Sequence, residues 1–343
     1  MSLNIQRRWL IATAASLSLL GSAPATFAQA PAPAPAAPAA APAPAVTPLL
    51  SRIKIATVGA PDVAQVEKLY TEWLDLKVLE KGKVSEGMAK SWGAPKAAGK
   101  PFVVMSSSGS PDVLIRAVQT DMVPGYKAMT THGWNAIEIL VEDPDKVYER
   151  LSKSPFVHVG GPKNLNPPFN SIRATQFKGP AEEILYFTAE QGDHAKSPLP
   201  PAKSFIDRPF IMVLAGPDAN AMTKFYMETF LMRGGPPNPT TIDIIAKAQG
   251  LPADHQFPLG LVRAAEKGNN IEIDGYPPSA GPRKRAEGQL PPGVAMTSFN
   301  VNSLDGLKVN FIQPPAKLYA DKRAATFIGP AGELTELIEE ARP

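Results

Sequence analysis

The chain of 343 residues contains no cysteine and only four histidines. Without cysteine it cannot form a disulfide, a thiolate zinc site or a cysteine nucleophile. An excess of one charge is also missing, because 35 basic residues stand against 32 acidic ones and the net charge is +3. Nucleic-acid binding requires a dense basic surface, so this balance argues against a nucleic-acid partner. The sequence likewise lacks a glycine-rich phosphate loop, a nucleophile elbow and a His-Glu-x-x-His zinc motif.

Residues 1–28 have the pattern of an export signal peptide. Arg7 and Arg8 precede an apolar run over 9–20, and small residues lead to an expected cleavage site near Gln29. A membrane helix needs about 20 consecutive apolar residues, so this run is short for an anchor, although an uncleaved anchor stays open. The arginine pair fits a twin-arginine signal as well as an ordinary one. We expect a periplasmic or secreted protein with no stable membrane span after processing.

Residues 29–49 form a linker made almost entirely of alanine and proline. Alternating prolines fix the backbone and remove hydrogen-bond donors, so the segment predicts a semi-extended spacer without a core. We expect it to hold the folded part away from the N-terminus and to carry no chemistry.

An internal repeat organises the rest of the chain. Residues 58–76 align with 214–232 at an offset of 156, and residues 174–188 align with 324–338 at an offset of 150. The identical pairs of the first alignment are Pro61/Pro217, Asp62/Asp218, Lys68/Lys224, Tyr70/Tyr226 and Glu72/Glu228. Those of the second include Phe177/Phe327, Gly179/Gly329, Pro180/Pro330, Ala181/Ala331 and Glu183/Glu333. The repeat predicts two homologous halves, 50–192 and 206–340, joined by a linker over 193–205.

Each half contains two copies of a smaller unit. Alternating or apolar runs typical of strands occur at 53–58, 136–141, 211–214 and 296–301, each ahead of an aspartate in a turn. The aspartate suits a helix N-cap, and helical spacing of apolar residues follows it. Short β-rich runs come after each helix. The pattern predicts strand–helix–strand–strand–strand, four times over.

The end of the chain, Gly-Pro-Ala-Gly-Glu-Leu over 329–334 and the Glu-Leu-Ile that follows at 336–338, resembles the last strand of the glyoxalase/bleomycin-resistance/extradiol-dioxygenase superfamily, also called vicinal oxygen chelate (VOC). The segment 224–231, with its Lys-Phe-Tyr and Phe-Leu, resembles the first helix of that superfamily. The resemblance spans nearly all of 51–340. It implies an α+β fold of four βαβββ modules in two tandem VOC domains, 50–192 and 206–340, with open eight-stranded cups around a small ligand.

Superfamily members that carry a divalent metal draw its ligands from four strands. The resemblance places the corresponding positions of the second half at Pro209, Glu272, Met296 and Glu336. In the first half it places them at Ile53, Arg116 (or Ile115 after a one-residue shift), Ala136 and Tyr186. Only Glu272 and Glu336 suit a hard divalent ion, since proline offers no side-chain donor and methionine is too soft. The metal site is therefore half present at best, and the cofactor stays unknown, with a divalent metal disfavoured.

Strand alternation suggests other residues that line the cups. If Ala136 faces the first cup, Trp134 and Glu138 face it too, where Glu138 and Arg116 would form a charge pair opposite Tyr186. An arginine beside an aromatic wall suits a carboxylated or phenolic ligand. In the second half Met296 and Ser298 share a face with Asn300, and Glu272 shares one with Asp274. The alternative is that Glu138 and Arg116 form a purely structural ion pair, which fills a cavity that no longer binds a ligand.

Three functions remain open from the sequence. The first is a lyase or isomerase, or a dioxygenase-like enzyme, that acts on a small oxygenated molecule, with Glu336 and Glu272 as metal ligands or one of them as general base. The second is a metal-free module that binds a small molecule for sequestration or sensing. The third is a structural protein that self-associates, for example as a homodimer. A convergent Glu272–Glu336 pair would favour the first, an open cup with Arg116 and Tyr186 the second, and collapsed cups the third.

Overall fold

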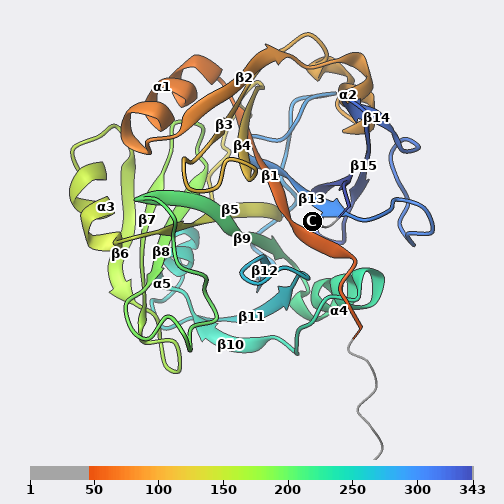
Figure 1. The fold of residues 1–343 in the computed structure, drawn as a ribbon. Coiled ribbons are helices and arrows are strands. Elements are labelled where there is room, and N and C mark those ends of the chain that lie inside the picture. Colours follow the sequence, from red (N-terminus) through yellow and green to blue (C-terminus); the bar gives the residue numbers. More distant parts are fainter. Residues whose placement is uncertain (1–45, 342–343) are drawn as a thin grey trace, which may run out of the picture. The chain divides into compact units, whose positions relative to one another are not determined.

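The predicted modules form two eight-stranded curled sheets in the computed structural model, which describes residues 46–341 (Figure 1). The predicted α+β fold class, with βαβββ modules and two eight-stranded cups, is confirmed. The expected signal peptide and most of the 29–49 linker lie outside the described residues. No helix within 46–341 is long and apolar enough to cross a membrane.

Modules 1 and 4 build sheet 1. Module 1 comprises β1 (Leu50–Ala60), α1 (Val63–Trp73), β2 (Lys77–Lys83), α2 (Glu86–Ser91), the 3-10 turn η1 (Pro95–Ala97), β3 (Pro101–Ser106) and β4 (Leu114–Gln119). Module 4 comprises β13 (Gly293–Val301), β14 (Ala316–Tyr319), β15 (Lys322–Ile328) and β16 (Leu334–Glu339). The strand order is β14-β15-β16-β13-β1-β4-β3-β2, so the outermost modules of the chain meet through β1 and β13.

Modules 2 and 3 build sheet 2. Module 2 comprises β5 (Gly133–Val141), α3 (Pro144–Leu151), β6 (Val157–Asn164), β7 (Ile172–Lys178) and β8 (Ile184–Glu190). Module 3 comprises β9 (Ile206–Gly216), α4 (Ala219–Phe230), β10 (Asn238–Thr241), α5 (Asp243–Gln249), β11 (Gln256–Arg263) and β12 (Asn270–Gly275). The order is β10-β11-β12-β9-β5-β8-β7-β6. Each sheet thus combines one module from each half of the repeat, a pairing that the sequence had left open.

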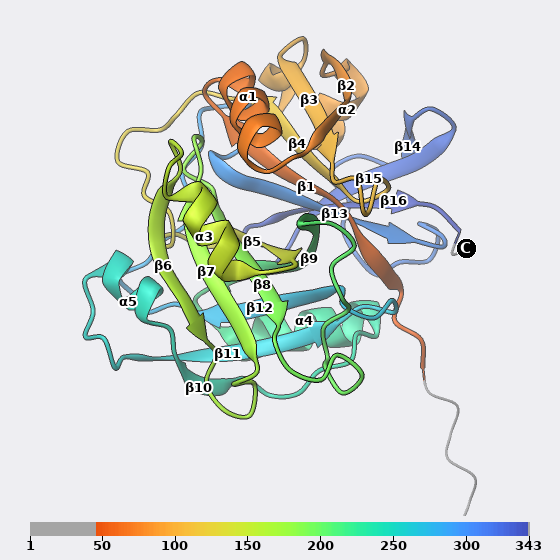
Figure 2. The same ribbon diagram turned by 60° about the vertical axis from the view of Figure 1, so that its left-hand side comes forward.

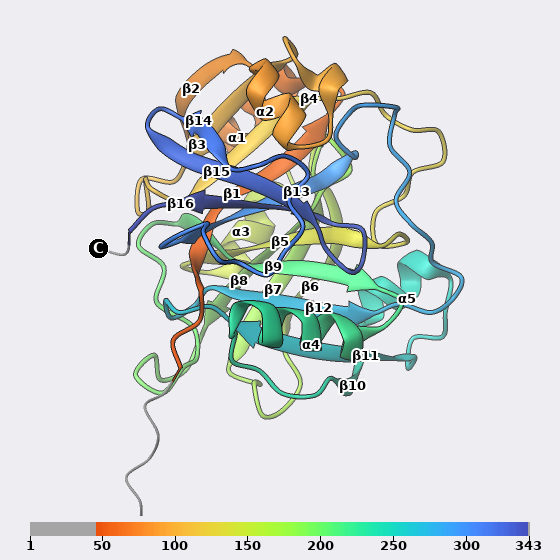
Figure 3. The same ribbon diagram turned by 90° about the vertical axis from the view of Figure 1, so that its right-hand side faces the viewer.

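Aspartate side chains start three of the helices, as the repeated turns predict. Asp62 accepts a hydrogen bond from the Gln65 backbone N–H, and Asp218 accepts the equivalent bond from Ala221. Asp143 caps α3 in the same way. An N-cap of this kind stabilises a helix by about 1 kcal/mol. The capped helices pack on the outer faces of the sheets, with α3 against β6–β8 (Figure 2) and α4 against β11 and β12 (Figure 3).

The fourth module differs from the predicted pattern because it has no helix among its described elements. Residues 302–315 form turns and bends instead. Gly306 has a φ of +78°, in the left-handed region that does not continue an α-helix. Leu304 is nevertheless buried, and Leu307 and Val309 pack against the same core, so the segment covers the sheet without helical geometry.

The outer faces of the two sheets share one hydrophobic core. Trp134 on β5 lies 6.3 Å from Phe299 on β13, measured between ring centroids, and its indole N–H donates to the Leu334 carbonyl on β16. These contacts join sheet 2 to sheet 1. The inner, concave faces are consequently turned away from this shared core.

A tyrosine–glutamate pair accounts for part of the internal repeat. The Tyr70 hydroxyl on α1 donates to Glu183 Oε1 at 2.6 Å, and the Tyr226 hydroxyl on α4 donates to Glu333 Oε1 at 2.7 Å. The other carboxylate oxygen of each glutamate accepts the backbone N–H two residues before it. A side chain on the glycine four residues before either glutamate would clash with the carboxylate at 1.9 Å. The repeated Gly, Ala and Glu therefore form one turn built to receive the tyrosine.

Candidate functional site

Two inner faces are the candidate sites, called cup 1 in sheet 1 and cup 2 in sheet 2. A short helix covers each of them. In cup 1, Met88 and Ala89 of α2, with Trp92 just beyond it, pack against Val104 and Met296. In cup 2, apolar side chains of α5 pack against the inner residues of the sheet, a cluster that comprises Ala136, Ile184, Tyr186, Val213, Ile244, Ile245, Phe257 and Tyr276.

Cup 1 holds a polar network centred on Glu336 of β16. Its Oε1 accepts the Trp92 indole N–H at 2.8 Å, and its Oε2 accepts the Ser298 hydroxyl at 2.6 Å. The Tyr319 hydroxyl lies 2.9 Å from both oxygens. Arg116 Nη2 is 3.4 Å from Oε2, in an ion pair whose two side chains are 1% and 0% exposed. The carboxylate therefore has donors on both oxygens and a counter-ion from the protein itself.

The guanidinium of Arg116, like the carboxylate of Glu336, is held by several hydrogen bonds. Its Nε and Nη2 donate to the Thr57 hydroxyl at 3.2 and 3.0 Å, and its Nη1 donates to the Tyr319 hydroxyl at 2.6 Å. The guanidinium also lies over the Trp92 ring, 4.6 Å from its centroid. A buried ion pair with this many hydrogen bonds is a self-contained unit. Cup 1 is filled by its own side chains, with no polar group of the network left for a ligand.

Cup 2 carries three acidic side chains, Glu138 of β5 and Glu272 and Asp274 of β12. Register places Glu138 beside Tyr186 on β8, and Tyr186 beside Gln176 on β7. The pKa of Tyr186 is raised well above its usual value by burial first, and then by the charges of Glu272 and Asp274. Three strands thus direct acidic and phenolic groups to one place, and a fourth, β7, adds the amide of Gln176.

Several acceptor atoms in cup 2 have no hydrogen-bond partner among the described residues. They are both carboxylate oxygens of Asp274, the hydroxyl of Tyr276 and the amide oxygen of Gln176. Asp274 is fully buried, and the other two residues are 3% and 5% exposed. Burying a polar atom without a hydrogen-bond partner destabilises the folded state by about 1–3 kcal/mol. Such atoms are therefore uncommon unless a ligand or water supplies the missing hydrogen bond.

The acidic groups of cup 2 have displaced pKa values. Burial raises the pKa of Asp274 to about 7. Burial also raises the pKa of Glu138 to about 7, although its hydrogen bond from Thr188 acts in the opposite direction. The pKa of Glu272 lies well above its usual value, through burial and then the charges of Asp274 and Glu138. Groups that titrate near neutrality in a covered cup mark a candidate functional site.

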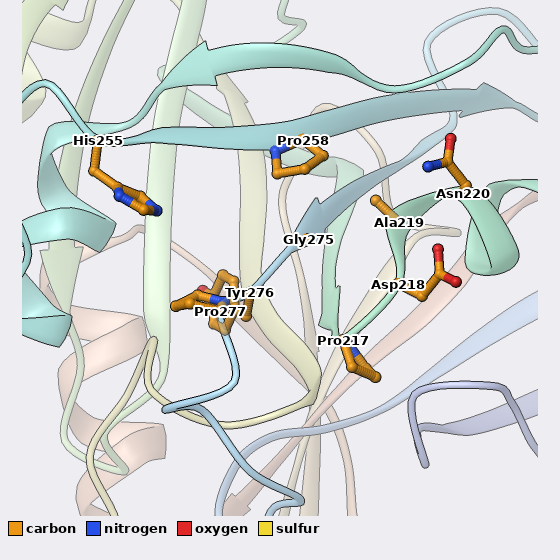
Figure 4. A pocket seen from close by; sticks show the side chains of 9 residues that line it. All are labelled: Pro217, Asp218, Ala219, Asn220, His255, Pro258, Gly275, Tyr276 and Pro277. Carbon is orange, nitrogen blue, oxygen red and sulfur yellow. The ribbon is translucent and has the colours of Figure 1, made fainter.

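A cavity of about 290 Å³ lies beside this cluster and shares Tyr276 with it. His255, Tyr276 and Pro277 form one side of the cavity, and Asp218, Ala219 and Asn220 at the start of α4 form the other, with Pro258 and Gly275 between them (Figure 4). The His255 ring packs edge-on against Phe257, which belongs to the inner cluster of cup 2. The cavity therefore adjoins cup 2 through Tyr276, and none of Glu138, Glu272 and Asp274 lines it.

The structure divides the predicted site residues between the cups. Arg116, Met296, Ser298 and Glu336 face cup 1, whereas Glu138, Tyr186 and Glu272 face cup 2. The expected pair of Arg116 and Glu138 does not form, because Arg116 pairs with Glu336 in the other sheet. Glu272 and Glu336 also lie in different sheets and cannot ligate one ion together. Both corrections follow from the exchange of modules between the halves.

Trp134 lies in neither cup, contrary to the predicted alternation. The register of β5 against β9 shifts between Trp134 and Ala136, which is an irregularity of the β-bulge type. Such a shift reverses the face on which the following side chains lie. Ala136 consequently faces cup 2, while Trp134 packs in the core between the sheets.

Sequence reasoning did not single out Thr57, Trp92, Tyr319 or Gln176. Thr57 pairs with Arg116 in the parallel register of β1 and β4, so its face could have been inferred once that pairing was known. Trp92 and Tyr319 come from the covering segment after α2 and from the edge strand β14. No sequence pattern marks a side chain that reaches a site from a covering segment.

The residues at the metal positions do not fit a metal centre. In cup 1 the four inward positions in register are Thr57, Arg116, Ser298 and Glu336, and a guanidinium cation repels a metal ion. In cup 2 they are Glu138, Tyr186, Val213 and Glu272, with a valine that offers no donor. Within 46–341 no three His, Cys, Asp or Glu side chains are placed to hold one ion.

The sequence matches no protein-family model, and no curated protein matches it significantly. Solved structures do resemble it. Glyoxalase I from Zea mays aligns with a TM-score of 0.56 and 15% identity over 84% of this chain and 92% of that one. A protein described as a dioxygenase from Bacillus subtilis aligns with a TM-score of 0.54 and 13% identity over 85% of each chain. At these identities the likeness concerns the fold alone: residues 46–341 adopt a tandem glyoxalase-like VOC fold.

Proposed function

We propose that the protein is an exported member of the VOC superfamily that binds a small molecule in cup 2 without using the superfamily's metal site. One observation carries the proposal, namely the contrast between the two cups. The polar groups of cup 1 satisfy one another, whereas buried acceptors of cup 2 have no partner among the described residues. A binding site needs polar groups that are free to meet a ligand, and cup 2 supplies them.

The composition of cup 2 suits a small organic molecule. Apolar side chains from α5 and from the inner strands surround a few convergent polar groups. Predominantly apolar walls with a few placed polar atoms are typical of small-molecule sites. The donor set, with a valine at one metal position and no histidine at any, gives no support to a metal-dependent reaction.

An acid–base enzyme is a second candidate, favoured by the pKa of about 7 for Glu138 and Asp274. A carboxyl that titrates near neutrality can remove a proton next to a carbonyl group and return it elsewhere, as in a lyase or isomerase. Glu336 does not suit this role, since both of its oxygens accept hydrogen bonds from buried donors. Glu272 remains a candidate base in cup 2.

The test is a thermal-shift screen of the mature chain against a library of small cations, neutral polar molecules and anions. We expect at least one class to raise the melting temperature of the wild-type protein and of Glu86→Gln, a surface control on α2. The same compounds should lose their effect on Glu138→Gln and Tyr186→Phe. The proposal is overturned if no class stabilises the protein, or if the cup 2 variants respond as strongly as the wild type.

Export is the part of the proposal that concerns residues outside the described structure. The Arg7–Arg8 pair, the apolar run and the small residues before Gln29 support it. Expression in a Gram-negative host followed by mass spectrometry of the periplasmic fraction should find a chain that begins near Gln29. A chain that keeps Met1 and stays in the cytoplasm would contradict export and leave the binding proposal intact.

A further inference from the structure

We infer that the ligand of cup 2 presents a protonated amine to Asp274, Glu138 and Glu272, and carries an apolar body. The inference rests on the proposed function and names the class of its ligand. Three lines of observation lead to it: the kind of atom that lacks a partner, the charge of the cup and its comparison with cup 1.

Three side chains of cup 2 have oxygen atoms without a hydrogen-bond partner among the described residues. Asp274 contributes two carboxylate oxygens and Gln176 an amide oxygen. Neither kind of atom can donate a hydrogen bond when the carboxyl is ionised, so each needs a donor from outside the protein. The Tyr276 hydroxyl can act in either direction. A ligand with several N–H donors on one atom meets this need, and a carboxylate or phenolate does not.

The three acids of the cup, once ionised, carry a negative charge that no basic side chain among the described residues is seen to balance. The charged groups that act on the pKa of Glu272 are Asp274 and Glu138, and no basic side chain acts on the pKa of any of the three acids. Arg283 acts on the pKa of Tyr276. Its Nε and Nη1 donate to Thr131 and the Val294 carbonyl, and its Nη2 has no hydrogen-bond partner among the described residues. A cation in the cup would therefore interact with three acids whose pKa values no basic side chain shifts.

The comparison of the cups shows that cup 2 lacks the buried arginine present in cup 1. Thr57 pairs with Arg116 in sheet 1, and Val213 pairs with Glu272 in sheet 2. Both residues of the second pair lie 156 positions after those of the first, which is the offset of the internal repeat. Glu272 therefore occupies the position of Arg116. Cup 1 contains an arginine that neutralises its glutamate, whereas cup 2 has an acid in that place.

The remaining surface of cup 2 is apolar, and this favours an organic amine over a bare metal ion. Ile244 and Ile245 of α5, with Ile184 and Phe257, surround the polar groups. No three acidic or histidine side chains of the described residues are arranged for a metal.

The test is calorimetric titration of the mature chain at pH 8 with benzylamine, and with benzyl alcohol and benzoate as matched neutral and anionic probes. We expect benzylamine to bind the wild type and the surface control Glu86→Gln equally. Its affinity should fall at least ten-fold in Asp274→Asn and in Glu138→Gln. Benzyl alcohol should bind at least ten-fold more weakly than benzylamine, and benzoate should give no heat of binding.

Other outcomes separate this inference from the proposed function. If benzyl alcohol or benzoate binds as tightly as benzylamine and the cup 2 variants abolish that binding, the amine is wrong and the binding function stands. If manganese chloride binds, benzylamine does not, and Asp274→Asn abolishes the manganese binding, cup 2 is a metal site and the inference of an amine ligand is wrong. If benzylamine binding is absent or unchanged in both variants, the inference fails, and the library screen decides the function separately. Asp274→Asn should fold, because it removes an uncompensated buried acid, and its thermal unfolding verifies this.

Discussion

Arg116 and Glu272 hold equivalent places in the two sheets, and their opposite charges give the cups different chemistry. The guanidinium of Arg116 is almost fully buried, which is tolerable only because Glu336, Tyr319 and Thr57 accept its hydrogen bonds. Glu272 has no such partner of opposite charge. A single position in the repeat thus determines whether a cup is closed by an internal ion pair or left with unbalanced charge.

Breaking the ion pair of cup 1 should destabilise the protein strongly. Glu336→Gln leaves Arg116 buried without its counter-ion, and we expect a loss of about 3 kcal/mol in the free energy of unfolding. Urea unfolding of the mature chain measures it. The double variant Arg116→Met/Glu336→Gln should recover part of the loss, because no unpaired charge remains. Lys90→Met, which breaks an exposed pair with Glu86, is the control and should change stability by less than about 0.5 kcal/mol.

The same measurements can contradict the interpretation of cup 1 as a closed structural unit. A Glu336→Gln variant as stable as the wild type would mean that Arg116 does not depend on this carboxylate. Cup 1 would then have a polar group available to a ligand, and the contrast between the cups would disappear.

Tyrosine–glutamate pairs connect elements that the sheets do not join. Tyr70 belongs to module 1 in sheet 1 and Glu183 to module 2 in sheet 2, and Tyr226 and Glu333 link modules 3 and 4 in the same way. The strands pair modules 1 with 4 and 2 with 3. The two sets of contacts together connect all four modules, which explains why the repeat preserves these tyrosines and glutamates.

Removing one tyrosine hydroxyl should weaken this connection by a measurable amount. Tyr70→Phe deprives Glu183 Oε1 of its donor, and we expect a loss of about 1–2 kcal/mol in the free energy of unfolding. Tyr226→Phe should cost a similar amount. The pairs share no residue, so the double variant should show the sum of the two losses. A double variant no less stable than either single one, by urea unfolding, would show that the pairs are not independent.

At the scale of elements, the sequence predicted the individual modules better than it predicted which modules share a sheet. The identical residues of the repeat and the aspartate caps indicated the modules, because helix starts and turn geometry depend on local residues. Exchange of modules between sheets leaves the alternation of every strand unchanged, so no local pattern reveals it. The prediction that Trp134 faces a cup was wrong because a register shift in β5 has no signature in the sequence. Glu272 and Asp274, two apart on a regular strand, were placed on one face and both act on Tyr186.

Buried acids among the described residues determine how the stability of the whole fold should vary with pH. Burial raises the pKa of Glu138, Glu183, Asp274 and Glu333 to about 7 in the folded state. Their usual values are 4.5 for glutamate and 3.8 for aspartate. Between those values and 7, the folded state binds more protons than the unfolded chain. Stability should therefore be greatest below about pH 5 and decrease as the pH rises through 7.

Acids with lowered pKa values limit this trend on the acidic side. The hydrogen bond from Arg323 is the main cause that lowers the pKa of Glu339 to about 2, and bonds and charges from Lys322 and Lys54 lower that of Glu340 to about 2 against the effect of its burial. These groups stabilise the fold above pH 4.5, and their contribution is lost as the pH falls toward 2. We expect the melting temperature to be highest near pH 5.

Thermal unfolding of the mature chain at pH 5, 6, 7 and 8 tests the expected decline. Each raised carboxyl adds a slope of up to about 1.4 kcal/mol per pH unit between its unfolded and folded pKa values, so several together should lower the melting temperature clearly by pH 8. Glu183→Gln with Glu333→Gln replaces two of these acids by uncharged amides of similar shape and should flatten the profile. A wild-type melting temperature that rises from pH 5 to pH 8 would contradict the expectation. Benzylamine should reduce the decline, since a bound cation stabilises the ionised acids of cup 2, and Asp274→Asn should abolish that rescue.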